Sequence, residues 1–165
     1  MRKQKKKDEG PAISRPRMPG YGVSESREGL LPWSWARQRL EKSHNYYIAT
    51  TRTGGAPHLM PVWGLWIADA FYFSTGDKSV KARNLRANPR CSVSTERGDE
   101  AVIVEGTARK LAARSIPQEF FPLYKKKYGW EMKGEPVWVV TPRVAFGFIE
   151  AADDFYKTAT RWSFE

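Results

Sequence analysis

The pattern of apolar and polar residues predicts a series of short strands joined by tight turns. The clearest example is the stretch Ala101–Leu111, where small or apolar residues occupy the even positions from 102 to 108, and Glu105 and Arg109 lie among the odd ones. A period of two is typical of a strand with one buried face. The same reasoning predicts seven strands, over residues 46–51, 57–67, 70–74, 91–95, 101–111, 137–141 and 144–149.

Three short helices are predicted between these strands. Pro32 suits the first turn of the first helix, and Asn88-Pro89 ends the second. Pro117 and Pro122 are expected to interrupt the third. Because the strands are not separated by helices of crossover length, a small antiparallel barrel with flanking helices is favoured over an open parallel sheet. The helices cover residues 32–42, 78–87 and 114–128, while residues 150–165 show no clear period.

A change of composition near residue 30 divides the chain in two. Residues 1–28 hold eight basic and four acidic residues, which is +4 of the chain's net charge of +10, and few large aliphatic residues. Such a segment cannot bury enough apolar surface to offset its ordering entropy, so residues 1–29 are expected to form a disordered basic tail before a folded domain over residues 30–165. A solvated tail is the favoured interpretation, and contact with nucleic acid or a membrane surface is the alternative.

The composition is that of one globular domain, with 165 residues of which 41% are hydrophobic and 28% charged. Cys91 is the one cysteine and there are two histidines, which excludes an intrachain disulfide and a cysteine- or histidine-rich metal centre. A reducing, cytoplasmic location is therefore expected. The longest run of low polarity, residues 60–68, is far shorter than the ~18–20 residues of a membrane span, so no membrane partner is expected. No Ser-His-Asp or Cys-His set can be assembled, so no catalytic side chain is predicted.

The segment Phe73–Leu85 has the features of an anion-binding loop. A predicted strand ends in small polar residues, turns at Gly76 and leads into a helix, whose first N–H groups lack partners. Such a loop suits a phosphate monoester, although the spacing is not that of a Walker P-loop. The alternative is a capped helix with a basic solvent face. The hydroxyl and cationic side chains concerned are Ser74, Thr75, Lys78, Ser79, Lys81 and Arg83.

The predicted strand over residues 57–67 has unusual features of its own. Pro61 donates no ladder hydrogen bond, so one edge of the strand must be free or bulged there. Gly64 allows the close approach of another backbone or of a flat ring. A planar heterocycle lying along exposed main chain would use such an edge.

Three blocks of sequence, in this order, resemble one known superfamily. They read TRTGGAPHLMPVWGLW, FYFSTGDKSVKARNLRANPR and VIVEGTARKL. They resemble the pyridoxamine 5′-phosphate oxidase-like split β-barrel proteins, and among these the flavin/deazaflavin oxidoreductases. The resemblance covers roughly residues 43–111. It implies a mostly β fold, a six- to seven-stranded antiparallel split β-barrel with short flanking helices, and a homodimer that binds FMN or the deazaflavin coenzyme F-420 at the subunit interface.

The resemblance also implies which residues hold the cofactor. In these proteins the cofactor supplies the chemistry, and the protein orients its ring and excludes water. The Arg-x-His pattern of true pyridoxine-phosphate oxidases is missing, because no histidine follows His58, so vitamin B6 oxidation is not expected. The implied residues are Thr75, Lys78, Ser79, Lys81 and Asn84 at the phosphate, Met60, Pro61, Val62 and Trp63 at the ring, and Arg161 and Trp162, where a partner chain completes the pocket.

These observations favour a flavin- or deazaflavin-dependent oxidoreductase that transfers a hydride to or from a small organic substrate. The alternative is a non-catalytic module of the same fold that binds a flavin, a deazaflavin or haem. Nucleic-acid binding is the less favoured third hypothesis, because the basic residues are not interleaved with aromatic residues in a recognisable single-strand platform.

Overall fold

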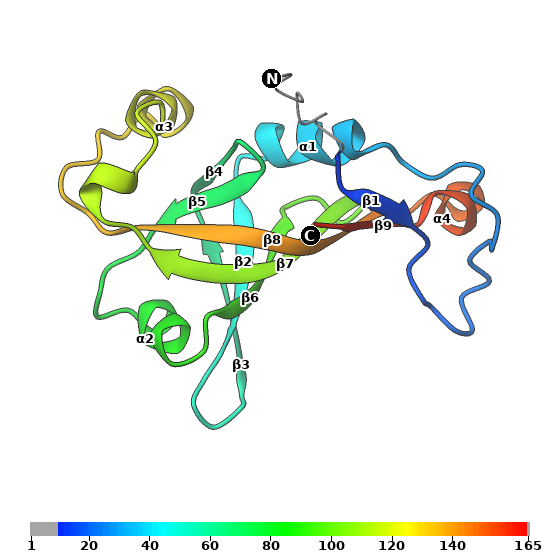
Figure 1. The fold of residues 1–165 in the computed structure, drawn as a ribbon, viewed down its shortest axis with the longest axis horizontal. Coiled ribbons are helices and arrows are strands. Elements are labelled where there is room, and N and C mark those ends of the chain that lie inside the picture. The colour runs from blue at the N-terminus through cyan, green and yellow to red at the C-terminus, as the bar shows by residue number, and fades with distance from the viewer. Residues whose placement is uncertain (1–9, 165) are drawn as a thin grey trace, which may run out of the picture.

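The strands form one antiparallel sheet that curls into an incomplete barrel (Figure 1). The computed structural model describes residues 10–164. The hydrogen-bonded order is β1-β9-β8-β7-β6-β2-β3, while β4 pairs with β5, and β5 also pairs with β8. The mostly β, antiparallel architecture that the sequence predicts is therefore confirmed. The strands are β1 (Ala12–Ser14), β2 (Tyr46–Thr51), β3 (Pro57–Val62), β4 (Gly64–Ile67), β5 (Ala70–Ser74), β6 (Arg90–Thr95), β7 (Glu100–Lys110), β8 (Val137–Ile149) and β9 (Thr160–Ser163).

The helices are short and lie around the sheet. The sequence analysis expects Pro122 to interrupt the third helix, and this expectation is wrong. Pro122 lies in the first turn of α3, where no intrahelical N–H donor is needed. Pro117 precedes the helix. In residues 10–164, no helix is long and apolar enough to cross a membrane. The helices are α1 (Trp33–Lys42), α2 (Val80–Ala87), α3 (Phe120–Tyr128) and α4 (Ala152–Thr158), with a 3-10 turn at Ala113–Ser115.

The barrel is completed by a bend in the chain. The single strand expected over residues 57–67 is two strands, since β3 pairs with β2 and β4 pairs with β5. Trp63 lies between them. Around the barrel, hydrogen bonds connect β4, β5, β8, β7, β6, β2 and β3 in that order. Between β3 and β4 only the chain itself makes the connection, so the hydrogen-bonded sheet is not closed. This is the geometry of a split barrel.

Near the C-terminus, the two strands expected over residues 137–141 and 144–149 are a single strand. β8 runs unbroken from Val137 to Ile149 and pairs with β7 along its length. The register shifts between Glu105 and Gly106, which is a β-bulge. A Cβ on Gly106 would lie 2.3 Å from the Thr141 carbonyl oxygen, so the bulge requires a glycine. Beyond β8, α4 and β9 form where the sequence shows no clear period.

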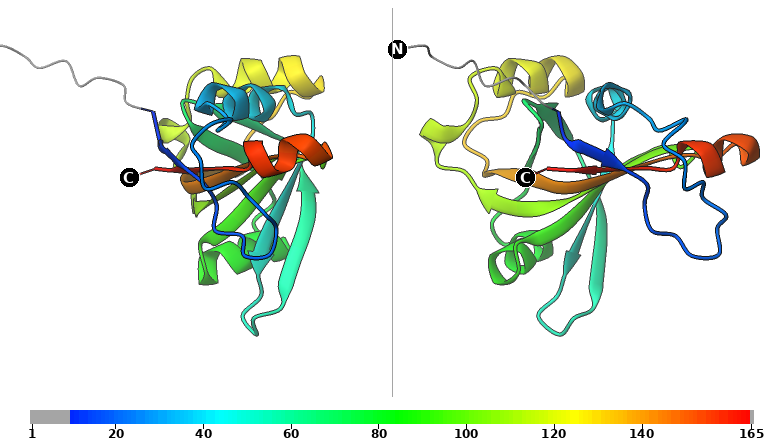
Figure 2. Two further views of the ribbon diagram at one scale, coloured as in Figure 1. Left: turned by 90° about the vertical axis from the view of Figure 1, so that its right-hand side faces the viewer. Right: turned by 45° about the vertical axis from the view of Figure 1, so that its right-hand side comes forward.

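Two apolar clusters hold these elements. The larger fills the barrel, and α1 covers its upper end (Figures 1 and 2). Trp33 and Leu40 of α1 are buried in this cluster. Cys91 of β6 is buried in this cluster, and burial raises the pKa of its thiol to about 12. The second cluster lies between α3 and the outer side of β4 and β8 and includes Leu65, Phe120 and Val139. The site described below is lined by residues from α3, β3, β5 and α2.

The N-terminal segment differs from the expected tail. β1 adds to the edge of β9, pairing Ile13 with Trp162. The Arg15 guanidinium donates hydrogen bonds to the carbonyl oxygens of Ser26 and Glu28 in its own segment and to those of Lys157 and Ala159 before β9. Residues 10–29 therefore belong to the fold, while residues 1–9 lie outside the described residues. The composition argument failed because main-chain pairing and one arginine, rather than apolar burial, hold this segment.

Replacing Arg15 with methionine should lower the free energy of unfolding by about 1–3 kcal/mol, because several hydrogen bonds from one charged group are lost together. Urea unfolding followed by circular dichroism measures this difference. The matched control is Arg17→Met, which removes the same charge from an exposed position two residues away. Equal stability of the two variants would contradict the role given to Arg15.

Candidate functional site

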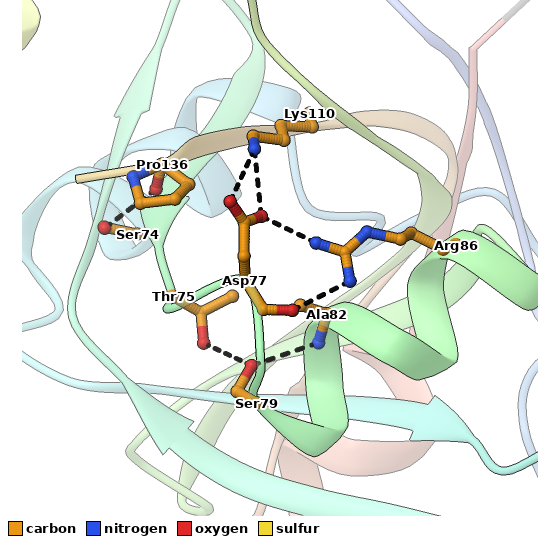
Figure 3. Close-up of polar contacts among 8 residues, drawn as sticks. All are labelled: Ser74, Thr75, Asp77, Ser79, Ala82, Arg86, Lys110 and Pro136. Atoms are coloured by element: carbon orange, nitrogen blue, oxygen red, sulfur yellow. Dashed lines mark hydrogen bonds and ion pairs between the residues drawn. The ribbon is translucent and has the colours of Figure 1, made fainter. Parts of the chain in front are cut away.

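The loop between β5 and α2, for which phosphate binding is predicted, is held by its own hydroxyl groups (Figure 3). Ser79 caps α2: its Oγ accepts a hydrogen bond from the Ala82 amide at 3.2 Å and lies 3.0 Å from Thr75 Oγ1. Ser74 Oγ donates to the Pro136 carbonyl oxygen at 2.8 Å. A serine cap stabilises a helix start. These contacts fix where the first turn of α2 begins relative to β5.

The acidic residue of this loop, Asp77, is paired with two cations. Lys110 Nζ lies 2.8 Å from the carboxylate and Arg86 Nη2 lies 2.6 Å from it (Figure 3). The hydrogen bond from Lys110, and then the charges of Lys110 and Arg86, hold the pKa of Asp77 below its ordinary value. The negative charge of the loop is thus balanced by β7 and by the last turn of α2. It does not neutralise Lys81.

Lys81, in the first turn of α2, borders a cleft of about 470 Å³. Burial lowers the pKa of its ammonium, and none of the ion pairs found in residues 10–164 includes it. A desolvated charge without a partner is unfavourable, so this position favours the arrival of an anion. The cleft is lined by Asn45, Pro61, Val62, Trp63, Ser74, Lys81 and Tyr124.

Positive charge also dominates beside the cleft, at His58 of β3. Burial, and then the charges of Arg52 and Lys81, lower the pKa of this imidazole. Its Nδ1 lies 3.4 Å from Thr50 Oγ1, which accepts a hydrogen bond from Asn84 Nδ2 at 2.9 Å. Arg52 and Lys81 are thus near enough to His58 to disfavour a further positive charge there, next to the polar network of Thr50 and Asn84.

Trp63 forms the aromatic wall of the cleft. Its indole stacks on the ring of Tyr128, with centroids 4.7 Å apart and planes 9° from parallel, and its side chain is 43% exposed. Tyr128 Oη accepts a hydrogen bond from the Gly64 amide and lies 2.8 Å from the carbonyl oxygens of Gly64 and His44. Lys127 Nζ donates to the Gly64 carbonyl oxygen at 3.0 Å. The end of α3 therefore holds the bend between β3 and β4, and with it the orientation of Trp63.

Only part of the predicted set of cofactor residues comes together at this cleft. Thr75 and Ser79 lie next to it but bond to each other. Lys78 is exposed and Met60 is 40% exposed, and neither lines the cleft. Asn84 is buried and bonded to Thr50, so its side chain serves the fold rather than the cleft. The predicted residues that line the cleft are Pro61, Val62, Trp63 and Lys81.

The two predicted residues of β9 lie elsewhere. Trp162 is completely buried in the larger cluster, where its ring packs against Trp33, so it is not available to a ligand in this structure. Strand alternation explains this, because Trp162 points into the barrel and Arg161 points out. Arg161 borders a separate hollow of about 630 Å³ on the outer side of the sheet, together with Phe146 and Phe148.

Sequence reasoning missed the contributions of α3 and of the residue before β2. Tyr124 and Asn45 line the cleft, and Tyr128 supports Trp63 from behind. Tyr124 and Tyr128 are four residues apart, which places them on one face of a helix. That spacing was the one sequence signal that could have indicated an aromatic face on this helix. Nothing in the sequence indicates that this face packs against the bend at Trp63.

Comparison with known proteins identifies the fold family. The sequence model described as "Pyridoxamine 5'-phosphate oxidase" matches residues 35–150. The chain belongs to this family. A search among curated proteins found no match.

Several solved structures show the same fold at low sequence identity. An F420 reductase is 22% identical with a TM-score of 0.56, and the match covers 66% of this chain and 94% of that one. A FAD-binding protein from Mesorhizobium loti is 17% identical with a TM-score of 0.59, covering 81% and 96%. The haem storage protein HutZ from Vibrio cholerae is 14% identical with a TM-score of 0.54, covering 67% and 87%.

Replacing Gly64 with alanine should destabilise the fold by about 1–3 kcal/mol through overpacking, because the added Cβ would lie 2.3 Å from the Phe71 ring and 2.8 Å from the Tyr72 carbonyl oxygen. The near-ultraviolet circular dichroism of the tryptophans should change as well, since the bend carries Trp63. Gly54→Ala is the control, because its Cβ would meet no atom within 4 Å. Equal effects of the two substitutions on stability would show that the chain at Gly64 can shift to accept a Cβ, which would contradict the requirement for glycine there.

Proposed function

We propose that the protein is a flavin- or deazaflavin-dependent oxidoreductase that binds FMN or coenzyme F-420 at the cleft between Lys81 and Trp63. The observation that carries the proposal is the half-buried ammonium of Lys81, which has no ion pair within residues 10–164, in the same cleft as the 43% exposed indole of Trp63. A phosphorylated tricyclic cofactor needs a cation for its phosphate and a flat apolar surface for its ring. The cleft offers both within one volume of about 470 Å³.

The residues present fit such a cofactor. Lys81, with the first N–H groups of α2, would hold the phosphate, because a helix N-terminus and an ammonium both favour an anion. Pro61, Val62 and Trp63 would face the ring. Tyr128 and Lys127 would keep Trp63 in place through Gly64.

The cleft lining contains no carboxylate and no imidazole. A bound flavin or deazaflavin supplies hydride transfer by itself, so this chain would contribute binding, ring orientation and exclusion of water rather than an acid or base. The same lining suits a non-catalytic module that binds a flavin, a deazaflavin or haem. Reduction of the bound cofactor by a chemical donor, and its reoxidation by candidate acceptors, would separate these two functions.

The proposal includes a homodimer with the cofactor at the subunit interface. Apolar side chains lie exposed on the outer side of the barrel: Leu59 is 61% exposed and Tyr47 is 42% exposed. Arg161, with Phe146 and Phe148, lies on an outer side of the sheet as well, where it would meet a second copy rather than its own cleft. A small-molecule substrate would enter beside the ring.

Sedimentation should give a mass near twice 18.9 kDa. The physical reason is that a single chain leaves the apolar outer side of the sheet uncovered. Sedimentation at several protein concentrations, with and without FMN, measures the assembly. A monomer that binds FMN tightly would contradict a shared site.

Lys81→Met should weaken FMN binding about ten- to a hundred-fold, because a charge-assisted contact to phosphate is worth roughly 1.5–3 kcal/mol. Riboflavin, which lacks the phosphate, should lose little affinity. Titrations that follow the absorbance and fluorescence of the ligand measure both. For F-420, its own absorbance band serves as the readout.

Lys78→Met is the matched control, since it removes the same charge from an exposed residue of the same loop that does not line the cleft. Its effect on FMN should be several-fold smaller than that of Lys81→Met. Equal losses for FMN and riboflavin, or equal effects of the two variants, would place the phosphate elsewhere.

A further inference from the structure

A second concave site lies on the other side of α3 from the cofactor cleft. It is a groove of about 490 Å³ lined by residues of α1, β4 and α3. Leu65, Trp66 and Ile67 of β4 and Leu123 of α3 supply its apolar lining, with Leu65 and Ile67 on the side of α3 and Trp66 on the side of the barrel interior. Its volume is within the range of about 300–1,000 Å³ usual for small-molecule sites. None of the residues lining the groove lines the cofactor cleft.

The rim of this groove is predominantly basic. Its basic lining residues are Lys42, His44, Lys126 and Lys127, and Glu41 is the one carboxylate in the lining. An apolar lining with a cationic rim matches a ligand that has an apolar body and a negative end. The charge alone would not single out this site, since the whole chain is basic.

Lys127 distinguishes this groove from an ordinary basic surface. Its Nζ donates to Tyr46 Oη at 2.9 Å and to the Gly64 carbonyl oxygen at 3.0 Å, and it lies over the rings of Tyr46 and Tyr128. An ammonium has three N–H donors, so one remains after these two contacts. No ion pair found in residues 10–164 includes Lys127. Burial lowers its pKa to about 8, against a smaller opposing effect of Glu96.

We infer that this groove binds an amphipathic monocarboxylate, with the carboxylate at Lys127 and the apolar body along β4. One half-buried ammonium with one donor to spare matches a single negative charge. A phosphate dianion would need more donors than the groove offers in its interior, because Lys42 and Lys126 are exposed. A neutral apolar molecule would leave the third donor of the Lys127 ammonium without an acceptor.

The test uses octanoate and its neutral analogue 1-octanol, titrated into the full-length protein at pH 7 by calorimetry. Octanoate should bind at least tenfold more tightly than 1-octanol, which corresponds to one charge-assisted contact. Inorganic phosphate should not compete with it. The measurement is repeated with saturating FMN, which should leave octanoate binding unchanged because the two sites share no lining residue.

The pH dependence gives an independent readout. The protonated amine attracts a carboxylate and the neutral amine does not, so octanoate affinity should fall as the pH rises through about 8. The other charged or titratable groups around this amine are Tyr46 on β2, Tyr128 and Lys126 on α3, Glu41 and Lys42 on α1, His44 before β2, and Glu96 after β6. Lys127→Met should abolish the fall above pH 8 and lower octanoate affinity to that of 1-octanol.

Two further variants keep the test decisive if Lys127→Met unfolds. Leu123→Glu places a charge at a position that is 41% exposed, and it should abolish binding of both ligands without affecting the melting temperature. Lys125→Met removes a charge from the same helix outside the groove and should change nothing. Equal binding of octanoate and 1-octanol, binding unaffected by Leu123→Glu, or displacement of FMN by octanoate would each overturn the assignment. If Lys81→Met changes FMN binding but not octanoate binding, the result bears on the proposed cofactor site and not on the groove.

Discussion

The bend between Val62 and Gly64 is the constraint on which the rest of the molecule depends. It lets one run of chain belong to two different strand pairs, and it turns an open sheet into a barrel with one unpaired seam. Gly64 permits it, because the Phe71 ring occupies the space that a Cβ would need. The hydrogen bonds of Tyr128 and Lys127 to Gly64 then tie α3 to the seam. The cleft and the groove lie on either side of that tie.

Much of the fold was accessible from local patterns. β2 and β5 have the predicted bounds because strong strand formers lie between clear turn residues. Two of the failures share one cause, namely contacts that a segment makes with other parts of the chain. The bend at Trp63 depends on Phe71 and α3, and β1 depends on β9. Residues that form structure only against a distant partner leave no periodic signal of their own.

The candidate site was predicted in part, for a related reason. Lys81 and Trp63 could be found from their neighbours in sequence, because a loop before a helix and a proline-interrupted strand are local features. Asn84 and Trp162 could not be judged in this way. Both have the chemistry of binding residues, but the packing of the sheet places one against Thr50 and the other in the core. Whether a polar or aromatic side chain meets solvent is a property of the assembled barrel.

The lone thiol gives the chain a built-in reporter of its own opening. Cys91 lies in β6, between β2 and β7, and its raised pKa keeps it protonated at neutral pH. Its side chain is 8% exposed and borders a hollow of about 380 Å³, so a small local opening there is enough to admit a thiol-specific reagent. With no second cysteine to compete, the rate of alkylation under native conditions reports local opening at this one residue, without any introduced label.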